Sequence, residues 1–571
     1  MENIIIIGAG AAGLSAALEL AKNGVVSILV SDMPSERAQS VMAEGGINAA
    51  ADTVNDSPEL HAKETYEAGK CIADIKAVSC MTKEAPHIIE ELFDNGMAFT
   101  LNKDNRPDVR AFGGQSVKRT FYAAANTGKQ LMYTLIDQVR SYEVKGLINR
   151  LTGWQFLRLL YDNNTSVGSN TSNKSNVSKG CVLYNPYTKE KKYLYGRLII
   201  ATGGLNGMFG NATGSVKNTG AVTANLFASG VRLANGEFIQ YHPTTVRLHG
   251  KNMLISEAVR GEGGRLYVLE NGEPYYFMED KYPKRGNLMP RDVIAREEWI
   301  QMQQGKQVYL DMSHLDRSVS EKKLKGVIDD CMRFLNLDPR KEPIPVTPGI
   351  HYFMGGIWVD INHRTSMDGL YAAGECACQY HGANRLGGNS LLGAMYGGRI
   401  AAKSAIEDSN KAYKKAEAYN AGAADESVNK EGIRNDIKDN QDIMSDMHDG
   451  SAKNADGSYV ENWHRMQDIL KEGLGIVRSE KTLSEALSKL DELTEKVRSE
   501  DDNTAAENEK QALSDCCLLG RAMLLCALER KESRGAHNRS DYPQVSDSFN
   551  LQTIAEYIDG MINIHFQEAG E

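Results

Sequence analysis

Residues 4–14 read IIIIGAGAAGL, a short apolar strand that runs directly into a G-x-G-x-x-G turn. The pattern predicts a helix over 14–22, stopped by an Asn-Gly pair, and a second strand over 25–30 that ends at Ser31 and Asp32. This order of strand, turn, helix, strand and acid is typical of a dinucleotide-binding unit. The same glycines without that context often form only a turn, so the complete unit carries the prediction.

Each glycine of this turn has its own physical reason. Gly8 permits the tight turn, Gly10 lets the backbone approach a pyrophosphate, and Gly13 lets helix and strand pack closely. The free N–H groups at the start of the helix, with its partial positive charge, attract phosphates. We therefore expect the cofactor to lie against the turn residues Gly8, Ala9, Gly10, Ala11, Ala12 and Gly13.

The composition favours a large cytoplasmic protein. A length of 571 residues suggests roughly three or four domains, and the net charge of −10 argues against a nucleic-acid-binding face. No stretch approaches the ~18 apolar residues of a membrane helix, and the first strand starts too close to Met1 for a signal peptide. The nine cysteines suit a reducing compartment, and no metal site is expected. Their spacing fits neither haem nor an iron–sulfur cluster, so any such centre must lie on another chain.

The glycine rhythm divides the chain into segments. Strands and helices alternate over 1–235, which predicts an α/β, doubly wound, Rossmann-like domain. A charged segment over 236–345 interrupts it as an α+β capping domain, and the dinucleotide fold resumes over 346–408. A helical domain over 409–530 and a small C-terminal segment over 531–571 complete the expected architecture.

Three local features refine this picture. A strand over 193–201 runs into Thr202-Gly203-Gly204, a sequence common where a flavin domain closes over its cofactor. The Asn-, Ser- and Thr-rich stretch 163–178 predicts a surface insertion between two strands. Residues 515–528 are apolar on most sides and predict a buried helix.

Several polar residues stand in contexts that are unusual for a core. Each has an ordinary structural interpretation alone; an Arg after a Pro, for example, commonly starts a helix. Together they combine three guanidinium groups and two imidazoles with few acids, which suits a small dianion. Beside a flavin, such a site indicates hydride transfer to or from a dicarboxylic acid. The residues are His242, Glu257, Arg260, Arg291, His351 and Arg385.

With these residues in place, the chain resembles the flavoprotein subunits of the succinate dehydrogenase/fumarate reductase family nearly from end to end. It is most similar to the branch that works with a diheme membrane cytochrome b. Beyond the first glycine turn, the resemblance is carried by VMAEGGIN (41–48), AFGG (111–114), NATGSVKNTG (211–220), ANGEFIQYHPT (234–244), SEAVRGEGG (256–264), GNLMPR (286–291), HYFMGG (351–356), GEC (374–376), HGANRLGGNSLL (381–392) and KESRGAH (531–537).

The resemblance implies roles at the dianion site. Arg291 would give a proton to fumarate or take one from succinate, and Glu257 and Arg260 would resupply it, because an arginine with a pKa above ~12 is a poor acid alone. His242 would belong both to this catalytic group and to the carboxylate-binding group. The residues expected against the substrate are His242, Thr244, His351, Arg385, Phe112 and Gly46.

The resemblance also implies FAD as the cofactor. Glu375 would bind its ribityl or ribose hydroxyls, and the helix that starts near Ser390 would place positive potential at the flavin N1. The expected FAD contacts outside the first turn are Ser31, Asp32, Ser40, Gly45, Gly46, Thr202, Gly203, Glu375, Arg385, Ser390 and Leu391.

One position departs from the family pattern. The family usually has a flavin-linking His in R-S-H-[ST]-V, whereas residues 37–41 read RAQSV and place Gln39 at that position. An amide cannot form the bond, so we expect non-covalent FAD. The histidyl link raises the flavin potential in this family, so its absence favours fumarate reduction over succinate oxidation.

The resemblance implies partner chains as well. Electrons would pass to or from a separate iron–sulfur subunit, which a membrane cytochrome b would anchor. The chain itself would then lie in the cytoplasm, peripheral to the inner face of the cell membrane.

Two other functions remain open at this stage. L-Aspartate oxidase, a soluble relative, is favoured by Gln39; it is opposed by Phe112, which offers a substrate ammonium no counter-charge, and by the sequence NRLGGNS at 384–390. A flavin-binding electron carrier without chemistry of its own is opposed by the complete set of polar residues.

Overall fold

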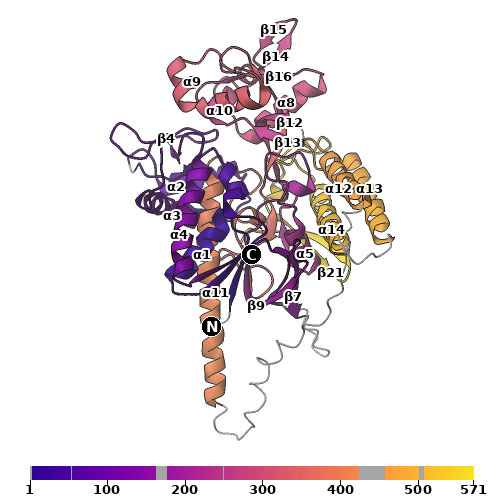
Figure 1. Cartoon of the computed structure of the whole chain (residues 1–571). Helices are drawn as coiled ribbons and strands as arrows, with labels where there is room; N and C mark the ends of the chain where they lie inside the picture. The colour runs from indigo at the N-terminus through magenta and orange to yellow at the C-terminus, as the bar shows by residue number, and fades with distance from the viewer. Residues whose placement is uncertain are drawn as a thin grey trace.

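The structure is a computed structural model that describes residues 3–52, 54–162, 176–248, 250–422, 457–499 and 507–570 (Figure 1). The surface insertion expected over 163–178 lies outside the described residues except for its last three positions. Of these, Val177 and Ser178 begin strand β8 (Val177–Tyr184).

A five-stranded parallel sheet forms the centre of the first segment. Its order is β19 (Leu370–Ala372), β10 (Arg197–Ile200), β1 (Ile4–Ile7), β2 (Ser27–Ser31) and β6 (Ile148–Thr152). All four pairings are parallel. The chain turns to opposite sides after β1 and after β10, so the carboxyl ends of these two strands form the switch point where such sheets bind ligands.

Helices cover this sheet. Helix α1 (Ala11–Lys22) packs against α11 (Asn389–Gly422) and α4 (Thr127–Val144). Helix α1 ends at the expected residue but begins three residues earlier than expected, directly after an extended Gly10. The glycine turn is therefore shorter and the helix N-terminus lies closer to the phosphate-binding position.

The strand expected over 193–201 was wrong in its extent. Two strands occupy this stretch: β9 (Lys191–Tyr195) and β10. Strand β9 belongs to an antiparallel sheet with β7 (Gln155–Asp162) and β8. Gly196 separates them with φ +145°, and a Cβ there would lie 2.2 Å from the carbonyl oxygen of Asn3. The glycine thus lets the chain turn from one sheet into the other at close range.

A second sheet stands beyond the first, at the top of Figure 1. Its order is β13 (Lys251–Leu254), β12 (Ile239–Leu248), β17 (Ile344–Phe353), β16 (Val308–Asp311), β14 (Arg265–Glu270) and β15 (Glu273–Tyr275). Helix α8 (Arg291–Gln303) packs against β12 and β17. The two strands connect this sheet to the rest of the chain, and the expected boundary at residue 345 falls inside β17.

Helices α12 (Gly457–Gly473), α13 (Glu480–Ser499) and α14 (Glu507–Glu529) pack on one another. By length and composition, helix α14 could cross a membrane. No apolar stretch of that length was expected from the sequence. However, 61% of its apolar window is buried inside the fold. It contains the 515–528 stretch expected as a buried helix, which is consistent with a core helix.

The C-terminal hairpin returns to the middle of the molecule. Strands β21 (Gln552–Ile558) and β22 (Met561–Gln567) extend a sheet of β11 (Leu233–Ala234), β18 (Gly356–Trp358) and β20 (Ala377–Cys378). Strand β11 precedes the strands of the second sheet in the chain and β18 follows them. This small sheet therefore holds together the two segments that lead into and out of the second sheet.

Candidate active site

A cavity of about 2650 Å³ runs from the glycine turn after β1 to the end of the second sheet. Every residue expected to contact the cofactor lines it, except Gly13. The dianion residues His242, Glu257, Arg291, His351 and Arg385 line the same cavity. The fold therefore joins in one space the two groups of residues that the sequence predicted separately.

The glycine turn is closed to side chains. Gly8 has φ +112°, and a Cβ there would lie 2.2 Å from the carbonyl oxygen of Ala201. A Cβ on Gly13 would lie 1.8 Å from the carbonyl oxygen of Gly8, which explains why Gly13 packs behind the turn instead of lining the cavity. Beside it, the backbone N–H of Ala11 donates to Ser40 Oγ at 3.1 Å. Gly10, Ala11 and Ala12 line the cavity, so the N-terminus of α1 faces the cofactor space, where a helix favours a phosphate.

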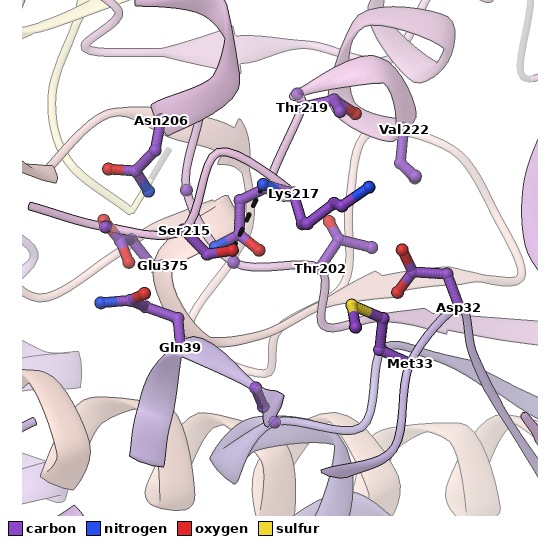
Figure 2. Close-up of a pocket in the computed structure, with 18 of the residues that line it drawn as sticks. Asp32, Met33, Gln39, Thr202, Asn206, Ser215, Lys217, Thr219, Val222 and Glu375 are labelled. Carbon is purple, nitrogen blue, oxygen red and sulfur yellow. Dashed lines mark hydrogen bonds between the residues drawn. The ribbon is translucent and has the colours of Figure 1, made fainter. Parts of the chain in front are cut away.

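The wall around this turn is polar and fits a dinucleotide (Figure 2). Partial desolvation raises the pKa of the Asp32 carboxyl, although the residue is exposed in the open cavity, and the charge of Lys217 opposes that shift. Asn206 lines the cavity, and both polar atoms of its buried side chain have no hydrogen-bond partner among the described residues. Buried amides are rarely left in this state, so the wall suits a ligand with hydroxyl and carbonyl groups.

Glu375 lies on the same wall and accepts a hydrogen bond from the backbone N–H of Phe353 at 3.1 Å. Its burial raises the pKa of the carboxyl to about 7. A side chain on Gly204 would collide with this carboxylate, with a Cβ only 2.6 Å from Oε1. Glu375 is thus placed to accept from a ligand hydroxyl.

Gln39 is the first residue of a short 3₁₀ helix, Gln39–Met42, and also lines the cavity (Figure 2). Its side chain is an amide, which has no nucleophilic nitrogen comparable to an imidazole. The position expected to link the flavin therefore faces the cofactor space but offers no group for a covalent bond.

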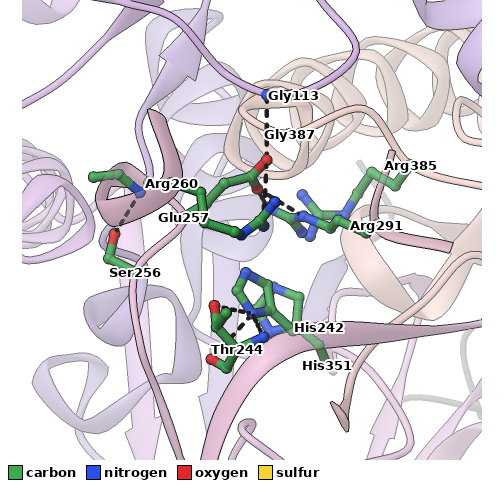
Figure 3. A network of polar contacts seen from close by, with 12 residues as sticks. Gly113, His242, Thr244, Ser256, Glu257, Arg260, Arg291, His351, Arg385 and Gly387 are labelled. Atoms are coloured by element: carbon green, nitrogen blue, oxygen red, sulfur yellow. Dashed lines mark hydrogen bonds and ion pairs between the residues drawn. The ribbon is translucent and has the colours of Figure 1, made fainter. Parts of the chain in front are cut away.

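Two arginines dominate the other end of the cavity (Figure 3). Arg291 is the first residue of α8; its Nη1 donates to Gln240 Oε1 at 2.9 Å, and Arg385 Nη2 donates to the same oxygen at 3.1 Å. One amide oxygen thus holds both guanidinium groups side by side. Gln240 was not predicted, although it precedes His242 by two positions on a strand, a spacing that favours a common face.

Glu257 fixes the other edge of Arg291. Its Oε2 accepts from Arg291 Nε at 2.8 Å and Nη2 at 2.5 Å, and its Oε1 accepts from the Gly113 N–H at 3.2 Å. Burial alone would raise the pKa of this carboxyl, but Arg291 and Arg260 outweigh it and lower the pKa to about 2. Arg260 Nη2 lies 3.8 Å from Glu257 Oε1, behind the cavity wall.

The two histidines form a pair of neutral donors. The ring centroids of His242 and His351 lie 5.0 Å apart. Burial lowers the pKa of His242 well below its ordinary value, and Arg291 and Arg260 lower it further. Burial and His242 do the same to the pKa of His351, whose Nδ1 lies 2.7 Å from Thr213 Oγ1. Thr213, which sequence reasoning missed, thus orients His351 from the loop before helix α5 (Ala221–Ala228).

Thr244, expected against the substrate, adjoins His242, with its Oγ1 3.4 Å from His242 Nδ1, and its role there stays a prediction. Its Oγ1 donates to the carbonyl oxygen of Ile255 at 2.8 Å, and its side chain does not line the cavity. The register of β12 shifts between His242 and Thr245, and such a bulge re-aims a side chain. Ser256, which was not predicted, lines the cavity next to Glu257 in the sequence.

Phe112 and Gly46 both line the cavity. The ring of Phe112 packs closely on two glycines: a Cβ on Gly45 would lie 3.1 Å from it, and one on Gly387 would lie 3.0 Å from it. Phe112 therefore forms an apolar wall beside Arg291 and Arg385.

Comparison with known proteins agrees with this arrangement. A family model described as "FAD binding domain" matches residues 3–391, and one described as "Fumarate reductase flavoprotein C-term" matches 463–568. The chain belongs to the succinate dehydrogenase/fumarate reductase flavoprotein family. It is 38% identical to the succinate dehydrogenase flavoprotein subunit of Bacillus subtilis, over 97% of this chain and 93% of that protein. It is 32% identical to the fumarate reductase flavoprotein subunit of Mycobacterium tuberculosis, covering 96% and 94% respectively.

Solved structures agree. A quinol–fumarate reductase with menaquinol has a TM-score of 0.82 at 29% identity, covering all of this chain and 98% of that one. A variant of E. coli quinol fumarate reductase FrdA has a TM-score of 0.80 at 28% sequence identity, covering 100% of this chain and 97% of that one. This family member is therefore an FAD-dependent oxidoreductase, and FAD is its cofactor, which the polar wall and the glycine turn fit.

Proposed function

We propose that this flavoprotein interconverts fumarate and succinate, with Arg291 as the proton donor or acceptor and with a bias to fumarate reduction. The observation that carries the proposal is the shared Gln240 oxygen, which sets Arg291 and Arg385 side by side next to two neutral histidines. The relatives are named as succinate dehydrogenase and fumarate reductase subunits, which supports this substrate class.

The charge balance of the site suits a dicarboxylate. Three buried guanidinium groups stand against one ionised carboxylate, Glu257. His242 and His351 can add neutral N–H donors without a further desolvated charge. Phe112 leaves one side of the site apolar, so an ammonium would be buried there without a counter-charge. These features favour fumarate or succinate over L-aspartate.

Arg291 is held for proton transfer. When bound, FAD supplies or accepts the hydride of this reaction. Glu257 holds the guanidinium through two N–H groups, so Arg291 can point its remaining donor edge into the cavity. After Arg291 gives up its proton, the neighbouring Glu257 and Arg260 return one to it. Such a path lets a weak acid act as a donor, because its deprotonated form is short-lived.

The bias to reduction rests on Gln39. A flavin held without a covalent link has a lower potential within this family, which disfavours electron uptake from succinate. Acid precipitation should then release all of the flavin to the supernatant, whereas flavin fluorescence that stays on the denatured polypeptide would contradict the non-covalent assignment.

We further propose that electrons pass through a separate iron–sulfur subunit anchored by a membrane cytochrome b. The relatives are named as subunits, and a solved neighbour with 27% identity is titled a complex. The chain would then be peripheral to the inner face of the cell membrane, on the cytoplasmic side.

Turnover with three substrates tests the proposal. With reduced viologen the protein should reduce fumarate; succinate oxidation with an artificial acceptor should be much slower; and L-aspartate should not be oxidised. Peroxide formed from L-aspartate and oxygen would assign the protein as an aspartate oxidase. A flavin-loaded protein inactive with all three substrates would be an electron carrier.

A further inference from the structure

The loop 385–389 connects Arg385 to the start of helix α11. Arg385 and Arg291 donate to the same Gln240 oxygen. In the middle of the loop, Gly387 lies against Arg291, because a Cβ on this glycine would lie 3.5 Å from Arg291 Nη2 (Figure 3). A movement of this loop would therefore change how the two guanidinium groups lie relative to each other.

The side chain of Asn48 holds this loop. It is fully buried, and its Nδ2 donates to the carbonyl oxygen of Gly387 at 2.7 Å and to Asn389 Oδ1 at 2.7 Å. Its Oδ1 accepts from the Thr120 hydroxyl at 2.6 Å and from Gln115 Nε2 at 3.0 Å. An amide has two N–H donors and two lone pairs on its oxygen, so these four bonds use all of them and fix the orientation of the side chain.

The backbone of Asn48 is fixed in a sheet. Strand β3 (Ile47–Asn48) pairs with β5 (Thr120–Phe121), and the backbone N–H of Asn48 donates to the carbonyl oxygen of Gly388 at 3.0 Å. The loop comes so close here that a Cβ on Gly388, whose φ is +87°, would lie 2.1 Å from Asn48 Oδ1. Asn48 thus bonds to three consecutive residues of the loop, 387–389.

We propose that Asn48 is a positioning residue for the dicarboxylate site, because it fixes the loop 385–389 and thereby holds Arg385 beside Arg291. Asn48 is not among the residues that line the cavity, so it acts through the loop and not on the substrate itself. The inference rests on the proposed function, in which Arg385 binds a carboxylate of the substrate.

Binding of malonate, a dicarboxylate that cannot accept a hydride, tests this role in the flavin-loaded protein without turnover. Asn48→Ala removes both side-chain bonds to the loop, so malonate binding measured by calorimetry should weaken about tenfold. In steady-state kinetics, KM for fumarate should rise by a similar factor, whereas kcat should fall less than about threefold.

Gln379→Ala is the matched control. Gln379 is also a buried amide, and its Nε2 donates to a backbone carbonyl oxygen, that of Asp360, at 3.1 Å. Its removal should lower the free energy of unfolding but change malonate binding less than about twofold. Equal losses of binding in Gln379→Ala and Asn48→Ala would overturn the proposal, because general destabilisation would then explain both.

A double-mutant cycle tests whether Asn48 acts through the loop. The three atoms nearest to the Cβ position of Gly388 all belong to Asn48, so Gly388→Ala should weaken malonate binding about tenfold or more. In the Asn48→Ala background this collision is absent, and the same substitution should add less than about threefold. The strain of an alanine at this positive φ is present in both backgrounds, so the difference between them reports the contact with Asn48.

Two further results would contradict the inference. Wild-type affinity for malonate in Asn48→Ala would show that the loop keeps its place without the amide, and additive effects in the cycle would show that Asn48 acts by another route. Wild-type protein that neither binds malonate nor reduces fumarate would instead defeat the proposed function and this inference with it, so the two failures are distinguishable.

Discussion

The two ends of the cavity are built in opposite ways. The turn at the cofactor end belongs to one contiguous stretch, β1 to β2, and would hold its ligand through backbone groups at Gly8 and the start of α1. The arginine end collects side chains from β12, α8, β17 and the loop before α11. A site built from backbone groups loses its ligand when any added side chain occupies the space. In a site built from side chains, each substitution removes only the role of that residue, such as substrate binding or proton transfer. Substitutions at the two ends should therefore differ in kind.

Gly13→Ala should have the largest effect, because it adds a Cβ only 1.8 Å from the backbone oxygen of Gly8. Neither backbone can move without displacing β1, so we expect a loss of about 3 kcal/mol or more in unfolding free energy together with loss of bound flavin. Denaturant unfolding and flavin content measure both effects.

Gly24→Ala is the matched control, since Gly24 has φ +71° but no atom within 4 Å of its Cβ position. It should cost about 1 kcal/mol and keep the flavin. Full flavin retention in Gly13→Ala would show that the turn is not the cofactor site.

Arg385→Ala should weaken substrate binding while the flavin stays bound. A carboxylate would lose a buried bidentate partner, which costs about 2–5 kcal/mol, so KM for fumarate should rise far more than kcat falls. Steady-state kinetics at constant flavin content separate the two effects. A fall in kcat at unchanged KM would mean that Arg385 takes part in the chemistry and not in substrate binding.

Glu375→Gln should have the smallest effect, visible in the flavin-free protein. Burial raises the pKa of Glu375 to about 7, so the stability contributed by its protonated form is present at acidic pH and is lost as pH rises through about 7. Above that pH the ionised group costs about 1–3 kcal/mol, which the amide avoids. Thermal unfolding should show the variant more stable than wild type at about pH 8 and equal to it at about pH 4. Equal stability at both values would show that Glu375 is not a buried titrating group.

The same contrast explains what the sequence could predict. Helix α1 ends at Lys22 as expected, because local signals specify a contiguous unit. Residue type singled out the six dianion residues, and all of them except Arg260 line the cavity. Gln240 and Thr213 were missed because their importance lies in long-range contacts with Arg291, Arg385 and His351.

Two departures from regular strand geometry have local physical causes. The register of β12 shifts between His242 and Thr245, so strand alternation does not place Thr244, and a single-sequence pattern does not reveal such a bulge. Gly196 broke an apolar run that reads as one strand, because its positive φ sends the chain from β9 into β10. In both cases the backbone departs from the regular alternation on which strand prediction depends.

The most direct test of the central claim compares wild type with Arg291→Ala at equal flavin content. The variant should reduce fumarate at least about 1000-fold more slowly while its flavin spectrum is retained, because Arg291 belongs to α8 and not to the glycine turn. Arg291→Lys should keep a small activity, since an ammonium can donate a proton but lacks the planar fork. Near wild-type turnover in Arg291→Ala would contradict the account and direct the search for the acid to His242 and His351.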